Sequence, residues 1–251
     1  MKISFTGKQF WGFTSVVFLL AVWKILSVLT GSGFVLPSPE KTLFTTLALF
    51  GEKEFLSVVG STLLRSLGGF ALSVIPGIAL GVLAGMHPNF NAFLQPILIT
   101  IRSVPVIALI LLALIWFTPG SVPVFIALLT MFPFICINVI DGMKSMDRDL
   151  TEMAAFYRVS RSRKIRELYI PGIMPFIISG ASSALGIGWR AIITGEVLSQ
   201  PRYGIGTLMH EAQTFLNVDA VIAWTIVAVV LSFGFEKTIR WFERRTFAWK
   251  F

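Results

Sequence analysis

The chain has 251 residues, of which 55% are hydrophobic and 14% charged, with a mean hydropathy of +0.80 and a formal net charge of +8. This composition excludes an ordinary soluble globular protein, and the longest polar stretch, about 141–168, is too short for a second, soluble domain. A single cysteine, Cys136, excludes a disulfide framework.

Long apolar runs recur along the chain. A span needs about 20 mainly apolar residues to cross a hydrocarbon core of about 30 Å. The first run is too long for a secretory signal and lacks a cleavage site after it, so we interpret it as a retained span. The sequence therefore predicts an all-α fold, a polytopic membrane helix bundle forming a single transmembrane domain over residues 1–251. Its six spans are expected at about 10–30, 60–84, 93–117, 121–140, 170–194 and 219–240.

The second and third spans are interrupted by Gly and Pro, as at Pro76, Pro96 and Pro105. Such breaks are tolerated in a membrane helix where neighbouring helices or water satisfy the freed backbone groups. We therefore expect these two spans to be irregular.

Basic residues are distributed unevenly between the predicted loops. Two thirds of the 21 Lys and Arg residues lie in the two terminal segments and in the 141–168 loop, whereas the opposite loops hold Lys41, Lys53 and Arg202. The positive-inside rule predicts that both termini and the 141–168 loop are cytoplasmic in a multi-pass inner-membrane protein. This topology and the lipid bilayer account for the net charge, so no nucleic-acid partner is expected.

The segment 152–171 is a basic helix–turn–helix between two apolar runs. Small Ala154 and Ala155 allow a partner to approach the backbone closely, and Glu152 precedes them. We interpret the segment as a docking site for a cytosolic partner, the alternative being an ordinary solvated loop. The basic run 161–166 is better explained by topology and by attraction to anionic lipid.

This segment resembles the EAA loop of ABC importer permeases, in which a glutamate and alanines precede a glycine. Glu152 and the Ile170–Pro171 pair keep the family spacing, but Arg158 occupies the glycine position. The turn there must therefore be made differently or carry strain, because glycine adopts positive φ freely. Further segments are similar to the nitrate/sulfonate/taurine/bicarbonate branch of these permeases: 61–70, 76–85, 102–117, 189–196 and 203–206.

The resemblance implies the fold of a type I importer permease, which pairs with a second permease subunit, here expected to form a homodimer. Two ABC ATPase subunits would bind ATP and magnesium, and an extracytoplasmic solute-binding protein would deliver a small solute, with an anion favoured. The chain itself would be no enzyme and would hold no cofactor or metal. Arg148, Asp149 and Glu167 would add contacts at the rim. The ATPase-coupling residues would be Glu152, Met153, Ala154, Ala155, Phe156, Tyr157 and Arg158.

Ionisable side chains within membrane spans are costly and therefore indicate either function or pairing. The candidates are Arg65, Arg102, Arg190 and Glu196. An arginine that faces a water-filled path would attract an anion. Alternatively, Arg190 and Glu196 lie near one membrane boundary and stabilise helix packing, and Arg65 extends toward the interface. The sequence leaves both interpretations open.

Two other classes of protein fit the sequence less well. An intramembrane serine protease would need a histidine near Ser182 or Ser183, but the two histidines, His87 and His210, are predicted in loops on opposite sides. An ion-gradient-driven secondary transporter would show inverted repeats and carboxylates near the midplane, and neither is evident. The sequence contains no Walker A motif, so a separate chain must hydrolyse ATP. His, Cys and carboxylate residues do not cluster with metal-ligand spacing.

Overall fold

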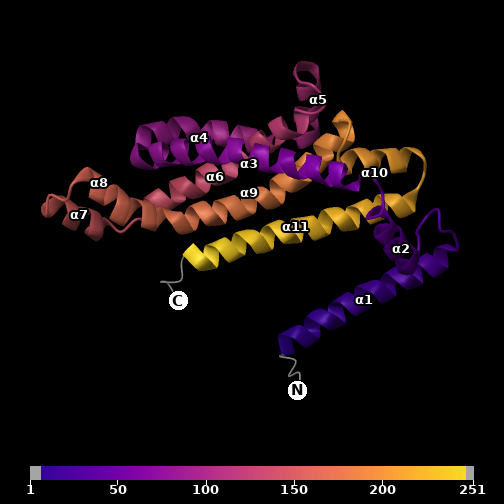
Figure 1. Ribbon diagram of the computed structural model, residues 1–251. Helices are drawn as coiled ribbons and strands as arrows, with labels where there is room; N and C mark the ends of the chain where they lie inside the picture. Colours follow the sequence, from indigo (N-terminus) through magenta and orange to yellow (C-terminus); the bar gives the residue numbers. More distant parts are fainter. Residues whose placement is uncertain (1–6, 247–251) are drawn as a thin grey trace. The chain divides into compact units, whose positions relative to one another are not determined.

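The computed structural model describes residues 7–246, which are mostly helical and contain no strand (Figure 1). The predicted all-α class is confirmed. Within the described residues, five helices are long and apolar enough to cross a membrane, or six spans if one bent pair counts as one. The chain divides into two compact units, Met1–Leu56 with Leu208–Val229 and Ser57–Thr207 with Val230–Phe251.

In the first unit, α1 (Gly7–Thr30) is joined to α2 (Pro39–Leu49) through polar contacts. Of residues 10–30, only Trp23 and Ser27 are partly covered, and both side chains donate to backbone carbonyls of the α1–α2 loop. Lys24 binds Glu40 at 2.8 Å, and this hydrogen bond lowers the pKa of the Glu40 carboxyl. Most of α1 thus presents apolar side chains outward, as expected of a lipid-facing helix.

The second unit is built around α6 (Val122–Lys144), which packs along α9 (Ile170–Ser199), and the two helices run side by side in Figure 1. Buried side chains from one face of α6 meet three from α9, and together they form the apolar core: Ala127, Met131, Ile135, Val139, Ala184, Leu185 and Ile192. Because every contributor is apolar and buried, this contact anchors the unit.

A row of glycines lets α3 (Phe55–Met86) approach α6 closely. A Cβ at Gly77 would lie 2.9 Å from the Ile135 side chain, and one at Gly81 would lie 2.7 Å from Val139. Small residues at every fourth position allow this close packing of membrane helices. The glycines of the second predicted span therefore serve helix contact, and α3 is continuous through Pro76.

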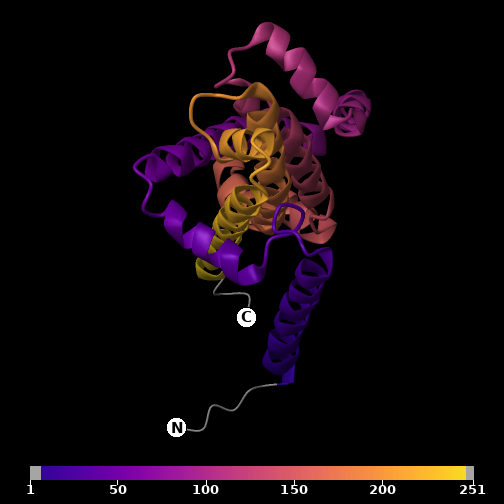
Figure 2. The same cartoon turned by 90° about the vertical axis from the view of Figure 1, so that its right-hand side faces the viewer.

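In the third predicted span, 93–117, which its prolines predict to be irregular, the structure has two helices. α4 (Pro88–Ser103) and α5 (Val106–Trp116) are bent by 94° with respect to each other, and α5 turns away from α4 in both views (Figure 1; Figure 2). Val104 is extended, with ψ 130°, because the ring of Pro105 disfavours a helical conformation in the residue before it. Pro105 also lacks the N–H that a continuing helix would need.

After α6 the chain forms α7 (Arg148–Phe156), α8 (Arg161–Lys164) and a π-helical turn, η1 (Ile165–Tyr169), which continues into α9. The amide of Ile170 donates to the carbonyl of Ile165, five residues back. Pro171 has no amide to donate, so the widened turn lies where the regular hydrogen-bond pattern is already interrupted. The remaining helices are α10 (Ile205–Thr214) and α11 (Val218–Thr246).

Candidate functional site

α7 is a short, separate helix between the long helices α6 and α9. Its N-cap is Asp147, whose carboxylate accepts a hydrogen bond of 2.9 Å from the amide of Asp149. This cap satisfies one of the amides that a helix N-terminus leaves unpaired. The helix therefore has a defined start at Arg148, and the predicted partner-binding residues 152–158 occupy its second half and the following turn.

The turn that ends α7 keeps the left-handed conformation despite the missing glycine. Arg158 has φ 53°. Its amide donates to the carbonyl of Ala155, and the amide of Val159 donates to that of Ala154, both at 3.0 Å. This is the Schellman pattern, in which a left-handed residue closes a helix C-terminus. Of the two expected alternatives, a different turn or a strained one, the structure has the strained turn. The strain arises because a residue with a Cβ is disfavoured at positive φ.

The outer face of this helix and turn is exposed and partly aromatic. The Phe156 and Tyr157 side chains are 82% and 71% exposed, and their rings meet edge to face with centroids 5.4 Å apart. Met153 and Ala155 are exposed beside them, and so is Glu152, whose carboxylate has no partner among the described residues. Exposed methionine and aromatic side chains are typical of surfaces that bind another protein. We refer to Glu152, Met153, Ala155, Phe156 and Tyr157 as the α7 surface.

The inner face of α7 packs toward the chain that follows. A cleft of about 300 Å³ lies between α7 and the segment formed by α8 and η1, and its lining includes Ala154 and Val159 together with Met153 and Tyr157 from the edge of the α7 surface. Glu167, on the far wall, binds Arg163 one turn earlier at 2.9 Å. Because η1 continues into α9, a displacement of α7 has a direct covalent route into a membrane-spanning helix.

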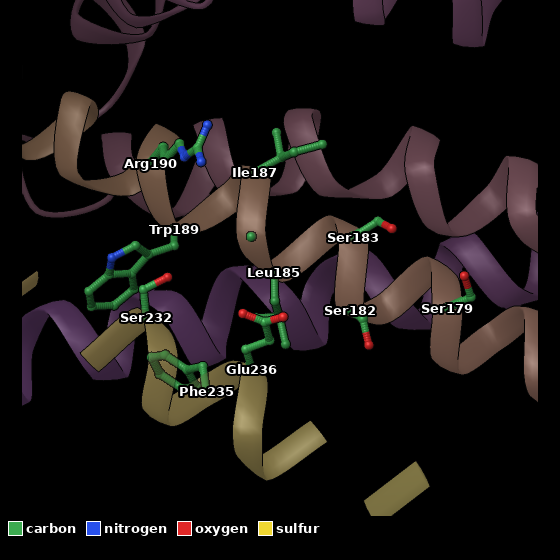
Figure 3. Close-up of a pocket in the computed structure, with 11 residues that line it drawn as sticks. Ser179, Ser182, Ser183, Leu185, Ile187, Trp189, Arg190, Ser232, Phe235 and Glu236 are labelled. Atoms are coloured by element: carbon green, nitrogen blue, oxygen red, sulfur yellow. The ribbon is translucent and has the colours of Figure 1, made fainter. Parts of the chain in front are cut away.

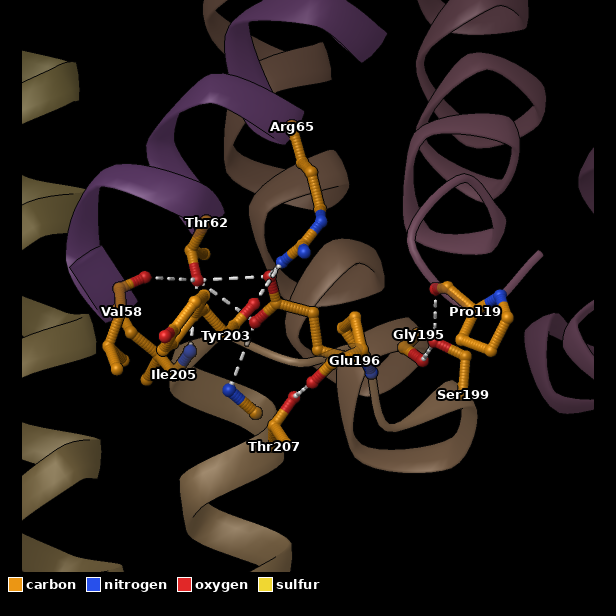
Figure 4. Close-up of polar contacts among 12 residues, drawn as sticks. Val58, Thr62, Arg65, Pro119, Gly195, Glu196, Ser199, Tyr203, Ile205 and Thr207 are labelled. Atoms are coloured by element: carbon orange, nitrogen blue, oxygen red, sulfur yellow. Dashed lines mark hydrogen bonds and ion pairs between the residues drawn. The ribbon is translucent and has the colours of Figure 1, made fainter. Parts of the chain in front are cut away.

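A second polar site joins α3 to α9 inside the second unit (Figure 4). The Glu196 side chain is fully buried, and its carboxylate accepts a hydrogen bond of 2.6 Å from the Arg65 guanidinium. Thr62 donates to both carboxylate oxygens at 3.0 Å, and the amide of Gly206 donates to one of them at 3.0 Å. Arg65 also donates to the carbonyl of Tyr203 at 2.7 Å. A buried carboxylate is stable only when paired and hydrogen-bonded in this way.

The loop after α9 passes so close to Glu196 that side chains are excluded from it. A Cβ at Gly204 would lie 2.7 Å from the Glu196 carboxyl carbon. A Cβ at Gly206 would lie 2.7 Å from Glu196 Cβ and 2.9 Å from the Val197 amide nitrogen. Glycine at both positions is therefore required by the close approach, and the start of α10 is held against the end of α9.

The other two intramembrane arginines lie elsewhere. Arg102, near the end of α4, lies over the Phe134 ring at 4.7 Å from its centroid, a cation–π contact. Arg190 is exposed on α9, and its guanidinium has no hydrogen-bond or ion-pair partner among the described residues. Glu196 is thus paired with Arg65, and Arg190 lies outside this pair.

Sequence reasoning missed Thr62 and the backbone groups of Tyr203 and Gly206 as partners of this charge pair. The sequence did carry a sign of the backbone partners: Tyr203–Gly206, directly after the helix that carries Glu196, alternates glycine with larger residues, a pattern that indicates a close backbone approach. Nothing in local spacing, however, indicates that a threonine 134 residues before Glu196 contacts it.

The chain matches the protein family described as "Binding-protein-dependent transport system inner membrane component" over residues 77–248. It is 34% identical over 236 residues to the putative aliphatic sulfonates transport permease protein SsuC of Escherichia coli, covering 92% of this chain and 88% of that protein. It is 27% identical over 242 residues to the taurine transport system permease protein TauC of the same organism, covering 94% and 88%. It is 27% identical over 237 residues to the bicarbonate transport system permease protein CmpB of Synechococcus elongatus, covering 90% of this chain and 84% of that protein.

The fold also resembles a solved structure, the inward-facing MetNI methionine ABC transporter, with a TM-score of 0.57 and 15% sequence identity. The match covers 74% of this chain and 94% of that one. At this identity the likeness concerns the fold alone.

Proposed function

The chain belongs to the family of binding-protein-dependent transport system inner membrane components and is a multi-pass ABC importer permease, and we propose that its solute is a small oxyanion. ATP hydrolysis belongs to a separate ATPase. The anion is supported by the relatives whose names specify sulfonates, taurine and bicarbonate, and by the exposed arginine on α9. An extracytoplasmic binding protein delivers the solute, as the family description implies.

The α7 surface is the proposed contact with the ATPase, which holds ATP and magnesium. The carrying observation is that an aromatic, solvent-exposed helix end is connected through α8 and η1 to the membrane helix α9. Ala155 keeps the side chain short where the partner approaches, Ala154 lines the cleft behind the α7 surface, and the left-handed turn at Arg158 closes the helix. Closure of the ATPase pair on ATP would move α7 and bias the two packings of an alternating-access cycle.

The proposed assembly is a pair of these chains, each acting as one transmembrane domain, with both termini and α7 on the cytoplasmic side. The basic residues of the 141–168 loop support this orientation. Arg65 pairs with Glu196 and Arg102 lies on Phe134, so the exposed Arg190 is the arginine that we propose for the path.

The test is purification of the tagged chain in mild detergent from its native host, followed by measurement of the retained ATPase and its activity. Ala155→Trp and Glu152→Lys should weaken ATPase retention and abolish solute-stimulated hydrolysis. Gly68→Ala on α3, where a Cβ would meet nothing within 4 Å, serves as the control and should retain both. Full stimulation in the assembled Ala155→Trp complex would contradict the assignment of the α7 surface.

A further inference from the structure

A groove of about 650 Å³ runs between α9 and the part of α11 that belongs to the second unit (Figure 3). One wall is apolar, because the rings of Trp189 of α9 and Phe235 of α11 meet at a tilt of 58° with centroids 5.4 Å apart. The remaining lining is largely polar, with hydroxyl groups from both helices and two charged side chains: Ser179, Ser182, Ser183, Ser232, Arg190 and Glu236.

Arg190 differs from the other two intramembrane arginines. Arg65 is engaged by Glu196 and Arg102 lies on an aromatic ring, whereas the Arg190 guanidinium has no partner among the residues that the structure describes. A guanidinium within a span is costly unless water or a counter-charge meets it. Its free donors therefore mark a wet site or a site for an anion.

The four serine hydroxyls in the groove are a second source of donors. Several other hydroxyls in the spans donate to the carbonyl four residues back, as Ser73, Thr100 and Ser199 do at 2.6, 2.8 and 2.7 Å. Such a bond satisfies a hydroxyl inside a helix bundle. Within the described residues, none of the four groove serines makes this bond or any other side-chain hydrogen bond. Their donors are available to a ligand.

The spacing along α9 places Arg190 and Ser183 on either side of a stretch of helix surface that large side chains leave uncovered. Arg190 and Ser183 are seven residues apart, a rise of about 10 Å along a helix axis. Side chains on a helix lean toward its N-terminus, and Figure 3 shows the Arg190 guanidinium directed along α9 toward Ile187. Between them lies Gly186, where a Cβ would meet nothing within 4 Å. A small ligand can thus lie over Gly186 within reach of both polar side chains.

We propose that this groove binds the oxyanion head group of the solute, with Arg190 as the counter-charge and Ser183 as a hydroxyl donor. This inference rests on the proposed import of a small oxyanion. A planar guanidinium pairs with two oxygens of a sulfonate, bicarbonate or nitrate, and each bond to the charged group is stronger than a neutral one. The Trp189–Phe235 wall contacts the apolar remainder of the solute. Serines spaced along α9 as far as Ser179 offer further donors as the anion moves along the helix.

The experiment measures how quickly a cationic methanethiosulfonate reagent labels Ser183→Cys in the permease–ATPase complex in nanodiscs. The unsubstituted chain supplies the background, because its cysteine, Cys136, is buried. Methanesulfonate, bicarbonate and nitrate are tested at high millimolar concentration against chloride. We expect at least one of the three oxyanions to slow labelling by about tenfold, the effect of one charge-assisted contact. In the double variant with Arg190→Gln the protection should disappear, whereas with Arg102→Gln it should persist.

Several results would overturn the proposal. They are protection that survives Arg190→Gln, protection by none of the three oxyanions, and a Ser183→Cys site that the reagent cannot reach in the assembled complex. Labelling that depends instead on anionic lipid in the nanodisc would assign the groove to a lipid phosphate and would likewise refute a solute site. An oxyanion that stimulates ATP hydrolysis without protecting Ser183→Cys refutes the groove alone. A chain that retains no ATPase refutes the proposed function itself.

Discussion

The Arg65 guanidinium on α3 binds the buried Glu196 carboxylate on α9 at 2.6 Å, although the two residues are 131 positions apart in sequence. Only 15% of the Arg65 side chain and none of that of Glu196 is exposed. The pair therefore joins two long helices of the second unit at a point from which most water is excluded. Thr62 and the amide of Gly206 complete the hydrogen bonding of the carboxylate, so the charge is compensated on both oxygens.

Removing one member of this pair should destabilise the protein more than removing both. Arg65→Gln leaves a buried carboxylate without its counter-charge, and such changes cost about 3–5 kcal/mol. The double variant Arg65→Gln with Glu196→Gln should be closer to the parent, because neither charge remains. Thermal unfolding of the purified chain and its three variants gives the coupling energy as a double-mutant cycle. Additive single effects would show that the ion pair contributes nothing.

Gly206→Ala should disrupt the same site without changing any charge. The new methyl group would lie against Glu196 Cβ and the Val197 backbone, and backbone atoms cannot easily move aside to make room for it. Overpacking of this kind costs about 1–3 kcal/mol. Gly68→Ala is the matched control, because its methyl group meets open space and alanine favours a helix by about 1 kcal/mol. The melting temperature should fall for the first variant and rise slightly for the second. Equal changes in melting temperature in the two variants would contradict the close approach at Gly206.

Arg158→Gly should relieve the left-handed strain at the end of α7. A residue with a Cβ costs about 1–2 kcal/mol in this conformation, and the greater flexibility of unfolded glycine offsets part of the gain. Hydrogen exchange at the amides of Arg158 and Val159 should slow, since their bonds to Ala155 and Ala154 become more stable. Arg158→Ala removes the charge but keeps the strain, so its exchange should not slow. Slower exchange in both variants would point to charge instead of backbone geometry.

Phe156→Ala should weaken binding of the ATPase while leaving the chain folded, because 82% of the side chain is exposed. An aromatic anchor at the centre of an interface contributes about 2 kcal/mol or more, equivalent to roughly 30-fold in Kd. Phe44→Ala on α2 removes a ring that is 80% exposed and lies outside the α7 surface. A titration of the immobilised permease with its ATPase compares the two. Equal loss in both variants would remove Phe156 from the proposed contact.

Acidification should weaken the link between α1 and α2. The hydrogen bond from Lys24 lowers the pKa of Glu40 below its usual value, so the stabilisation is present above the unfolded pKa and is lost as pH falls through the lower, folded pKa. The Trp23 and Ser27 bonds to the loop do not titrate and should persist. Hydrogen exchange in residues 36–42 should therefore increase at acidic pH in the parent, whereas Glu40→Gln should show the increase at every pH. If Glu40→Gln kept the pH response, the titration of Glu40 would not be its cause.

Length and hydropathy were sufficient to predict the all-α membrane fold, and the resemblance of residues 152–171 and of further segments to the family's motifs predicted the family. These features are local: a run of apolar residues must leave water whatever its neighbours are, and loop charge alone orients a span. The Arg158 turn was also anticipated as an alternative, because backbone sterics at one residue set its cost. Pro105 marked a break for the same reason, although the 94° angle at it depends on what α4 and α5 pack against.

The tertiary structure alone decided which charges meet. Spacing along the chain allowed Glu196 to lie near Arg190 at the same membrane boundary, yet the side chain turns to Arg65 and leaves Arg190 facing the groove. That choice follows from the rotation of α9 about its axis, which the packing of Ala184, Leu185 and Ile192 against α6 determines. The sequence determined that this chain spans a membrane and carries charges within it. Because helix rotation is set by contacts between distant segments, only the folded structure could distinguish the paired arginine from the available one.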